Sequence, residues 1–190
     1  MAVSFSSQSF SKINYTQQPL PKGEYEDCSF AYCDFSAASL SGNLFIDCIF
    51  INCNLSLAKL HETLLRDVQF KDCKMLGLLF DTCNQFGLSF TFEDCTLNNT
   101  SFYKANIKKT IFKSCQLQEA DFTEANLTEA VFNHCNLAGA KFENTILEKA
   151  DLRTAYNYAI DPTTNKVKKA KFSLEGVTGL LGRFNIVIES

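Results

Sequence analysis

The chain has 190 residues and a net charge of −3, with 46% hydrophobic and 21% charged residues. This is the balance of one soluble globular domain with a sizeable core, and it argues against a disordered or strongly polyionic chain. The N-terminus lacks a basic start followed by an apolar run, and no apolar stretch approaches the length of a membrane span. We therefore expect a cytoplasmic protein, without membrane contact, whose nine cysteines are reduced thiols.

The first 22 residues precede the repeats and are expected to form a lead-in that caps the N-terminal end of the domain. Beyond them, large residues recur every five positions from Phe30 to Phe80 and again from Leu97 to Leu152. An α-helix would place them every 3.6 residues and a strand every 2.0, so neither element explains the spacing. The second run is displaced by two residues. This displacement predicts a small bulge or loop within FGLSFTF, residues 86–92, with Phe92 back in register.

A longer period explains the shorter one. The pattern Phe-x-x-Cys-x-(Leu, Met or Phe) begins at residues 30, 50, 70, 92, 112 and 132. Four pentapeptides therefore return the chain to an equivalent place, which predicts a square coil of six turns stacked as parallel strands about 4.8 Å apart. The predicted core has two opposite phenylalanine walls, made of Phe30, Phe50, Phe70, Phe92, Phe112 and Phe132 and of Phe80, Phe102, Phe122 and Phe142.

All nine cysteines fall at the small inward position of the five-residue repeat, and eight of them lie two residues before a large apolar residue. Six of them are expected to form a ladder: Cys33, Cys53, Cys73, Cys95, Cys115 and Cys135. A zinc site would need convergent tetrahedral ligands. Disulfides would need side chains aimed at one another rather than in parallel. The pattern favours small buried hydrophobic residues and no metal or cofactor.

The sequences ADFTEANLTEAVF (residues 120–132) and CNLAGAKF (residues 135–142) resemble the A-(D/N)-L-x-x motif of the pentapeptide-repeat family. The resemblance covers residues 23–157. It implies an all-β fold, a right-handed quadrilateral β-helix. Residues 25–50 and the tail LLGRFNIVI (residues 180–188) are also similar to the quinolone-resistance and microcin-immunity proteins of that family. This narrower resemblance implies a homodimer joined through its C-termini that mimics duplex DNA and binds DNA gyrase or topoisomerase IV.

Residues 158–190 are expected to form a separate capping and dimerisation segment. Asp161-Pro162 predicts a turn, and KVKKAKF (residues 166–172) predicts a short strand with a basic face. Ser173 is a suitable N-cap for a helix that ends near Gly182, and Phe184–Ile188 is expected to be a terminal strand. The expected dimer contacts are Leu174, Val177, Leu180, Leu181, Phe184, Ile186 and Ile188.

The sequence contains no GxGxxG, Walker, GxSxG or HExxH motif, so it predicts a non-enzymatic binding module. The candidate interaction surface is acidic and consists of Glu62, Asp81, Asp121, Glu124, Glu129, Glu143 and Glu148. Such a stripe on a rod as wide as a duplex could enter a basic DNA-binding saddle without the protein itself binding nucleic acid. Lys104, Lys108, Lys109 and Lys113 interrupt it. Two function classes therefore stay open: a DNA mimic that regulates or protects a type II topoisomerase, and a protein-interaction rod with an unrelated partner.

Overall fold

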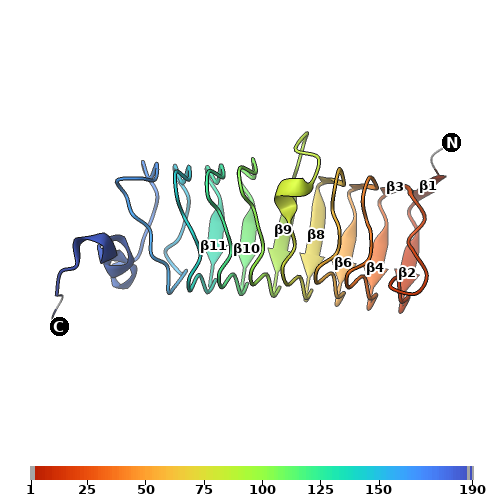
Figure 1. Ribbon diagram of the computed structural model, residues 1–190, viewed down its shortest axis with the longest axis horizontal. Helices are drawn as coiled ribbons and strands as arrows, with labels where there is room; N and C mark the ends of the chain where they lie inside the picture. Colours follow the sequence, from red (N-terminus) through yellow and green to blue (C-terminus); the bar gives the residue numbers. More distant parts are fainter. Residues whose placement is uncertain (1–2, 188, 190) are drawn as a thin grey trace.

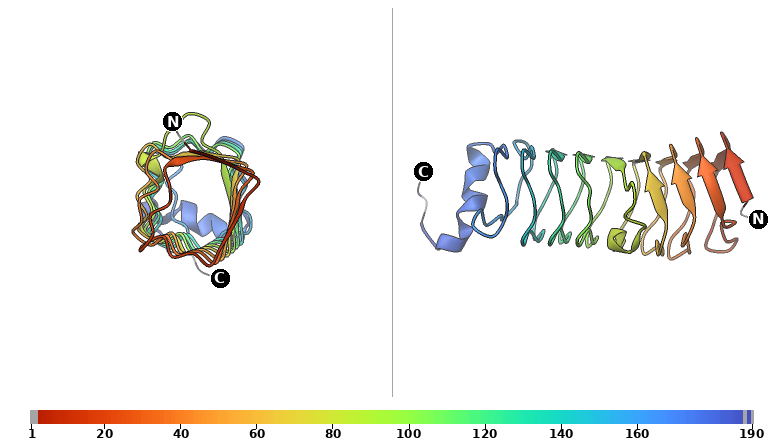
Figure 2. Two further views of the ribbon diagram at one scale, coloured as in Figure 1. Left: turned by 90° about the vertical axis from the view of Figure 1, so that its right-hand side faces the viewer. Right: turned by 90° about the horizontal axis from the view of Figure 1, so that it is seen from above.

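The computed structural model describes residues 3–187 and 189. The chain winds into a straight rod with the N-terminus at one end and a short helical segment near the other (Figure 1). Seen along its axis the rod has a square outline (Figure 2), which is the expected quadrilateral β-helix. No helix in the described residues is long and apolar enough to cross a membrane.

Short strands on two sides of the square form two parallel sheets. One has four strands in the order β1-β3-β5-β7, and the other has seven in the order β11-β10-β9-β8-β6-β4-β2. The remaining two sides are joined by isolated parallel bridges such as Asn54↔Lys74 and Ser101↔Asp121. The strands are β1 Val3–Ser6, β2 Ser9–Ser11, β3 Gly23–Glu26, β4 Ser29–Ala31, β5 Leu44–Ile46, β6 Ile49–Ile51, β7 Leu64–Arg66, β8 Val68–Lys71, β9 Phe90–Glu93, β10 Ile111–Lys113 and β11 Val131–Asn133. The 3-10 helices are η1 Phe80–Thr82, η2 Glu175–Leu180 and η3 Gly182–Phe184.

We name the four walls after the first large inward residue of each. The Phe5 wall carries the four-stranded sheet, and the Phe10 wall carries the seven-stranded one. The Tyr15 and Leu20 walls complete the square in chain order.

All ten phenylalanines predicted to form the core are buried. The Phe10 stack has neighbouring ring centroids 4.7–5.3 Å apart, and the facing stack, from Phe80 to Phe142 on the Leu20 wall, has them 4.7–5.1 Å apart. Offset stacks of this kind add to the hydrophobic stabilisation of the core.

The coil is longer than expected at both ends. Its first turn lies within the supposed lead-in, because β1 pairs with β3, β2 pairs with β4 and Tyr15 stacks on Phe35. The physical reason is that Phe5, Phe10, Tyr15 and Leu20 already have the five-residue spacing. At the other end, parallel bridges join Ile146 to Lys166 and Asp151 to Lys171. The boundaries at residues 22 and 157 are therefore wrong, and residues 166–172 belong to the coil rather than to an independent strand.

The two-residue displacement forms a protruding loop after η1, visible in Figures 1 and 2. Phe92 pairs with Phe70 across β8 and β9 and stacks between Phe70 and Phe112, as predicted. Phe90 is also buried, opposite Val68, and lies against Phe80 with ring centroids 5.2 Å apart. Of the phenylalanines in residues 86–92, only Phe86 is exposed, with 78% of the residue accessible.

The tail differs from the expected helix and strand. Two 3-10 helices replace the helix, and Gly176 and Gly179 lie directly against Tyr158, where a Cβ atom would clash. Two glycines in one short segment also weaken helix formation. Ser173 does cap the segment, since its Oγ accepts the N–H of Gly176 at 3.0 Å. Phe184 ends η3 and residues 185–187 form no strand, so the expected terminal strand is wrong over these residues. Ile188 lies outside the described residues.

The nine cysteines are free and buried. Within the ladder, the N–H of Cys33 lies 3.4 Å from Cys53 Sγ, and the thiols of Cys53 and Cys135 donate to carbonyls of the preceding coil at 3.3 Å. These contacts match small hydrophobic residues with weak S–H donors.

We expect the thiols to be inaccessible in the native protein. Burial raises the pKa of the Cys48 thiol from 9.0 to about 11 and also raises the pKa of Cys83. Thiolate is the reactive form, so an aromatic disulfide reagent near pH 8 should detect no thiol until the protein is unfolded, and then all nine. Unfolded thiols lose their protons above pH 9 while Cys48 keeps its own up to about 11. The free energy of unfolding should therefore fall as the pH rises through this window. If the reagent reacted rapidly with even one thiol of the native protein, the predicted inaccessibility of the thiols would be wrong.

Candidate functional site: the outer walls of the rod

Large side chains fill the interior of the rod, so a binding function must use the outer walls. At most corners the outward residue has a left-handed backbone, for example Asp47 with φ 51° and Asp67 with φ 53°. This conformation costs about 1–2 kcal/mol for a residue other than glycine. It is held because the corner N–H bonds to the next coil, as from Asp47 to the Arg66 carbonyl at 3.0 Å. The corners therefore present side chains in straight, evenly spaced rows.

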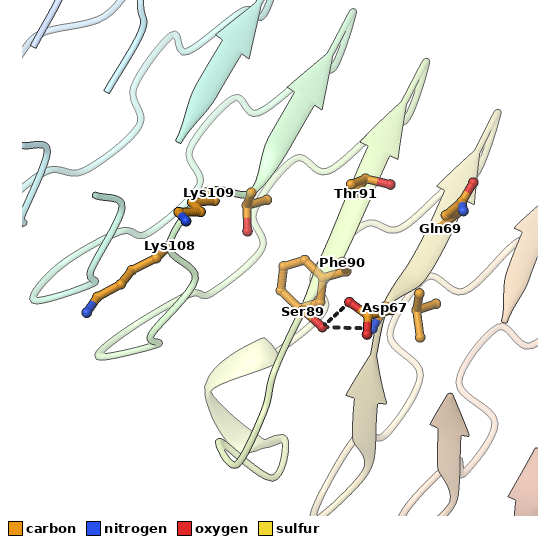
Figure 3. Close-up of a pocket in the computed structure, with 9 residues that line it drawn as sticks. Asp67, Gln69, Ser89, Phe90, Thr91, Lys108 and Lys109 are labelled. Carbon is orange, nitrogen blue, oxygen red and sulfur yellow. Dashed lines mark hydrogen bonds between the residues drawn. The ribbon is translucent and has the colours of Figure 1, made fainter. Parts of the chain in front are cut away.

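The loop interrupts one of these rows and leaves a notch of about 430 Å³ beside it. Ser89 takes the corner position without a left-handed backbone. Its Oγ accepts the Asp67 N–H at 2.7 Å and donates to the Asp67 carboxylate at 3.0 Å. Lys108 and Lys109 of the next coil line the other side, as Figure 3 shows. A shallow notch with cations on one side and a carboxylate on the other suits contact with a protein surface better than enclosure of a substrate.

The loop beside the notch is locally braced. The Asn84 side chain accepts the N–H of Phe86 at 2.9 Å, and the Gln85 amide donates to the carbonyls of Phe80 and Cys83 at 3.3 and 3.0 Å. Gly87, with φ +69°, completes the turn at no steric cost. Phe86 is therefore presented to solvent by a defined turn.

The acidic residues predicted as an interaction surface lie in rows on two walls. Glu124 bonds through its N–H to the carbonyl of Glu143 one coil on, and Glu129 likewise to Glu148. On the Leu20 wall Asp121 lies between Ser101 and Lys141. The coil thus brings four of the seven glutamates and aspartates together in pairs, but cations stand among them.

Two lysines neutralise part of this surface. Lys104 lies 3.5 Å from Glu124, and Lys149 lies 2.8 Å from Glu129. The hydrogen bond from Lys149 holds the pKa of Glu129 below its usual range. Glu62 and Asp81 lie on the other side of the loop, where the Glu62 N–H bonds to the carbonyl of Thr82. The predicted stripe is consequently a mixed surface and not a continuous row of free carboxylates.

The predicted dimer residues lie on the tail at the C-terminal end of the rod. Leu174 is 87% exposed, Phe184 52% and Ile186 56%, whereas Leu180 packs against the core. The tail is held to the rod by Arg183, which bonds to the Asp161 carboxylate at 2.8 Å and to the Thr163 hydroxyl. An apolar surface is thus presented away from the rod by a segment that is itself anchored.

One row of acidic residues escaped the sequence analysis. Asp27, Asp47 and Asp67 occupy successive corners after β3, β5 and β7, and all three are exposed. Their spacing of twenty residues was the signal that could have found them, because the same period that orders the inward residues also orders the outward ones.

A parallel coil of pentapeptides with a closed apolar core and regular outer walls defines a β-solenoid repeat protein. The family model described as "Pentapeptide repeat region" matches residues 24–91 and 88–156, so the chain belongs to the pentapeptide-repeat family. No curated protein matches its sequence closely enough to count as a relative.

Solved structures share the fold at low sequence identity. A trypsin-treated form of QnrB1, a plasmid-mediated fluoroquinolone resistance protein, matches with a TM-score of 0.63 and 18% identity over 100% of both chains. Full-length QnrB1 matches with a TM-score of 0.62 and 16% identity, covering 97% of this chain and 100% of that one. HetL, a protein involved in the regulation of heterocyst differentiation in the cyanobacterium Nostoc, matches with a TM-score of 0.47 and 15% identity, covering 90% and 85%.

Proposed function

We propose that this chain is a non-enzymatic, cytoplasmic binding protein that engages a type II topoisomerase, DNA gyrase or topoisomerase IV, as a mimic of duplex DNA. The observation that carries the proposal is the likeness to QnrB1 along the whole length of both chains. QnrB1 is a fluoroquinolone resistance protein, so the corresponding activity here would be protection of the enzyme from quinolones or from a toxin with the same target.

The rod has physical properties that suit such a mimic. It is straight (Figure 1), its core is closed, and Glu124 with Glu143 and Glu129 with Glu148 place pairs of acidic residues on neighbouring coils, about 4.8 Å apart. A basic saddle that accepts DNA attracts regularly spaced negative charge over a distance set by salt. The homodimer belongs to the same proposal, because joining two rods through the exposed apolar tail would double the length of the charged surface.

A supercoiling assay tests the proposal directly. Purified gyrase with relaxed plasmid and a quinolone should regain supercoiling as the protein is titrated, and excess protein without drug should slow the reaction through competition with DNA. Glu124→Lys combined with Glu143→Lys should weaken both effects about tenfold, as expected for a loss of about 1.4 kcal/mol. Gln118→Lys on the Tyr15 wall is the matched control and should leave both unchanged. Absence of any effect at a large excess of protein would contradict the proposal.

The alternative is a protein-interaction rod with an unrelated partner. The ion pairs of Glu124 with Lys104 and of Glu129 with Lys149 favour it, because they reduce the free negative charge that DNA mimicry needs. A chain that changes gyrase supercoiling neither with nor without a quinolone, but remains a stable rod, would belong to this second class.

A further inference from the structure

None of the three aspartates in the row Asp27, Asp47 and Asp67 forms an ion pair in the described residues; the carboxylates of Asp27 and Asp67 accept only the hydroxyls of Ser7 and Ser89. Their N–H groups are fixed, those of Asp27 and Asp47 by the carbonyls of Ile46 and Arg66 at 3.0 Å and that of Asp67 by Ser89. The carboxylates therefore stand one coil apart, about 4.8 Å. Like charges at this spacing repel one another, so a matching row of cations would be attracted to them.

Aliphatic side chains lie beside this row. Leu44 and Ile46 point outward from β5 and Leu64 from β7, and all three are half-buried. The fourth outward residue of these two strands, Arg66, has its guanidinium beside Gly87 of the protruding loop. The corresponding outward positions of β1 and β3 are polar, with Ser4 and Ser6 in β1 and Glu24 and Glu26 in β3. The outer face of the four-stranded sheet thus has an apolar strip along an acidic edge, and the protruding loop stands beyond β7 (Figures 1 and 2).

We propose that this face docks one cationic amphipathic α-helix of a partner protein, lying along the rod axis. Residues four apart on a helix are about 5–6 Å apart, close to the spacing of the three carboxylates. Asp27 and Asp67 are two coils apart, a distance of about 10 Å along the rod axis. An α-helix covers this distance in about seven residues, because each residue advances it by about 1.5 Å. Three lysines or arginines on one side of two helical turns therefore meet all three aspartates.

The apolar side of the same helix covers the aliphatic strip. A helix is about 10 Å wide with its side chains, so a neighbouring apolar stripe lies over Leu44, Ile46 and Leu64 when its cations lie over the row of aspartates. Nucleic acid would be repelled by this edge. The surface is on the Phe5 wall and does not include Glu124 or Glu143. The proposed helix docking can therefore be tested independently of topoisomerase binding.

A synthetic peptide of about 14 residues tests the inference with the intact chain. It carries lysines at its third, seventh and tenth positions, leucines at the second, sixth, ninth and thirteenth, and alanine or glutamine elsewhere. A control peptide has the same composition with lysines and leucines interleaved around the helix. Fluorescence anisotropy of the labelled peptides gives their affinities in low and in physiological salt. The patterned peptide should bind at least about tenfold more tightly than the control, a difference of about 1.4 kcal/mol.

Two variants locate the peptide on the face. Asp47→Asn keeps a residue that tolerates the left-handed corner, and Ile46→Thr keeps a β-branched residue in β5, so both should fold. Each should weaken binding of the patterned peptide about tenfold. Asp72→Asn is the matched control, because Asp72 has the same corner geometry with φ 53° on the next row. Equal affinity of the two peptides, or an equal effect of Asp47→Asn and Asp72→Asn, would show a diffuse polyanion and overturn the proposal.

Discussion

Replacing Phe112 with alanine is expected to lower the free energy of unfolding by about 3–5 kcal/mol, the usual cost of truncating a large core aromatic residue. Phe112 is fully buried, with ring centroids 5.2 Å from Phe92 and 4.9 Å from Phe132. It also meets the edges of Phe102 and Phe122 from the facing stack. A rod has no alternative layer that could collapse into the vacated space, so the cavity should persist and the loss should lie toward the upper end. Urea unfolding followed by circular dichroism measures it.

Cys115→Ala is the matched control for this variant. Cys115 lies in the same turn and is equally buried, but its replacement removes a single sulfur atom. The loss should be about 1 kcal/mol, close to that of one buried methylene group. The denaturant slope should stay the same in both variants, because the surface exposed on unfolding hardly changes. Equally small losses for Phe112→Ala and Cys115→Ala would contradict the view that the phenylalanine stacks carry the core.

The periods of five and twenty predict most of this fold because the coil has no freedom at its inward positions. Each large residue must stack on its equivalent one turn away, so residues such as Phe70, Phe92 and Phe112 could be assigned to one wall from spacing alone. The same spacing resolved the displaced register at Phe92. The prediction failed at the first turn, where Phe5 and Phe10 keep the spacing. Polar residues and prolines there, such as Gln8 and Pro19, obscure the small inward positions.

The outer walls were less predictable because outward positions accept almost any residue. Aspartate, lysine and leucine all occupy left-handed corner positions, so the residue type does not reveal which residues lie at corners. Pairings such as Lys104 with Glu124 depend on which corner residues are twenty apart. The tail departs furthest from expectation. Its course depends on the close approach of Gly176 and Gly179 to Tyr158, a contact that no periodicity encodes.

The intact chain is expected to be a dimer joined through its C-terminal tail. Leu174, Phe184, Ile186 and Val187 are 52–87% exposed although all are large and apolar, while the rod end below them is already covered by Leu180. Several large apolar residues exposed on one short segment are typical of an interface. Light scattering at micromolar concentration should give about 42.6 kDa, twice the chain mass of 21.3 kDa. Phe184→Asp should place a charge in the interface and shift the mass towards 21.3 kDa.

Phe86→Asp is the control for the dimer, because Phe86 is at least as exposed as Phe184 but lies on the loop, far from the tail. It should leave the dimer intact. Deleting residues 173–190 should give monomers that aggregate, since the buried Tyr158 loses Gly176 and Gly179 as its cover and the Ile160 N–H loses its bond to the carbonyl of Gly179. A monomer of the intact chain at micromolar concentration would refute the dimer. It would also halve the length of charged rod available to a DNA-binding saddle, and so weaken the case for topoisomerase binding.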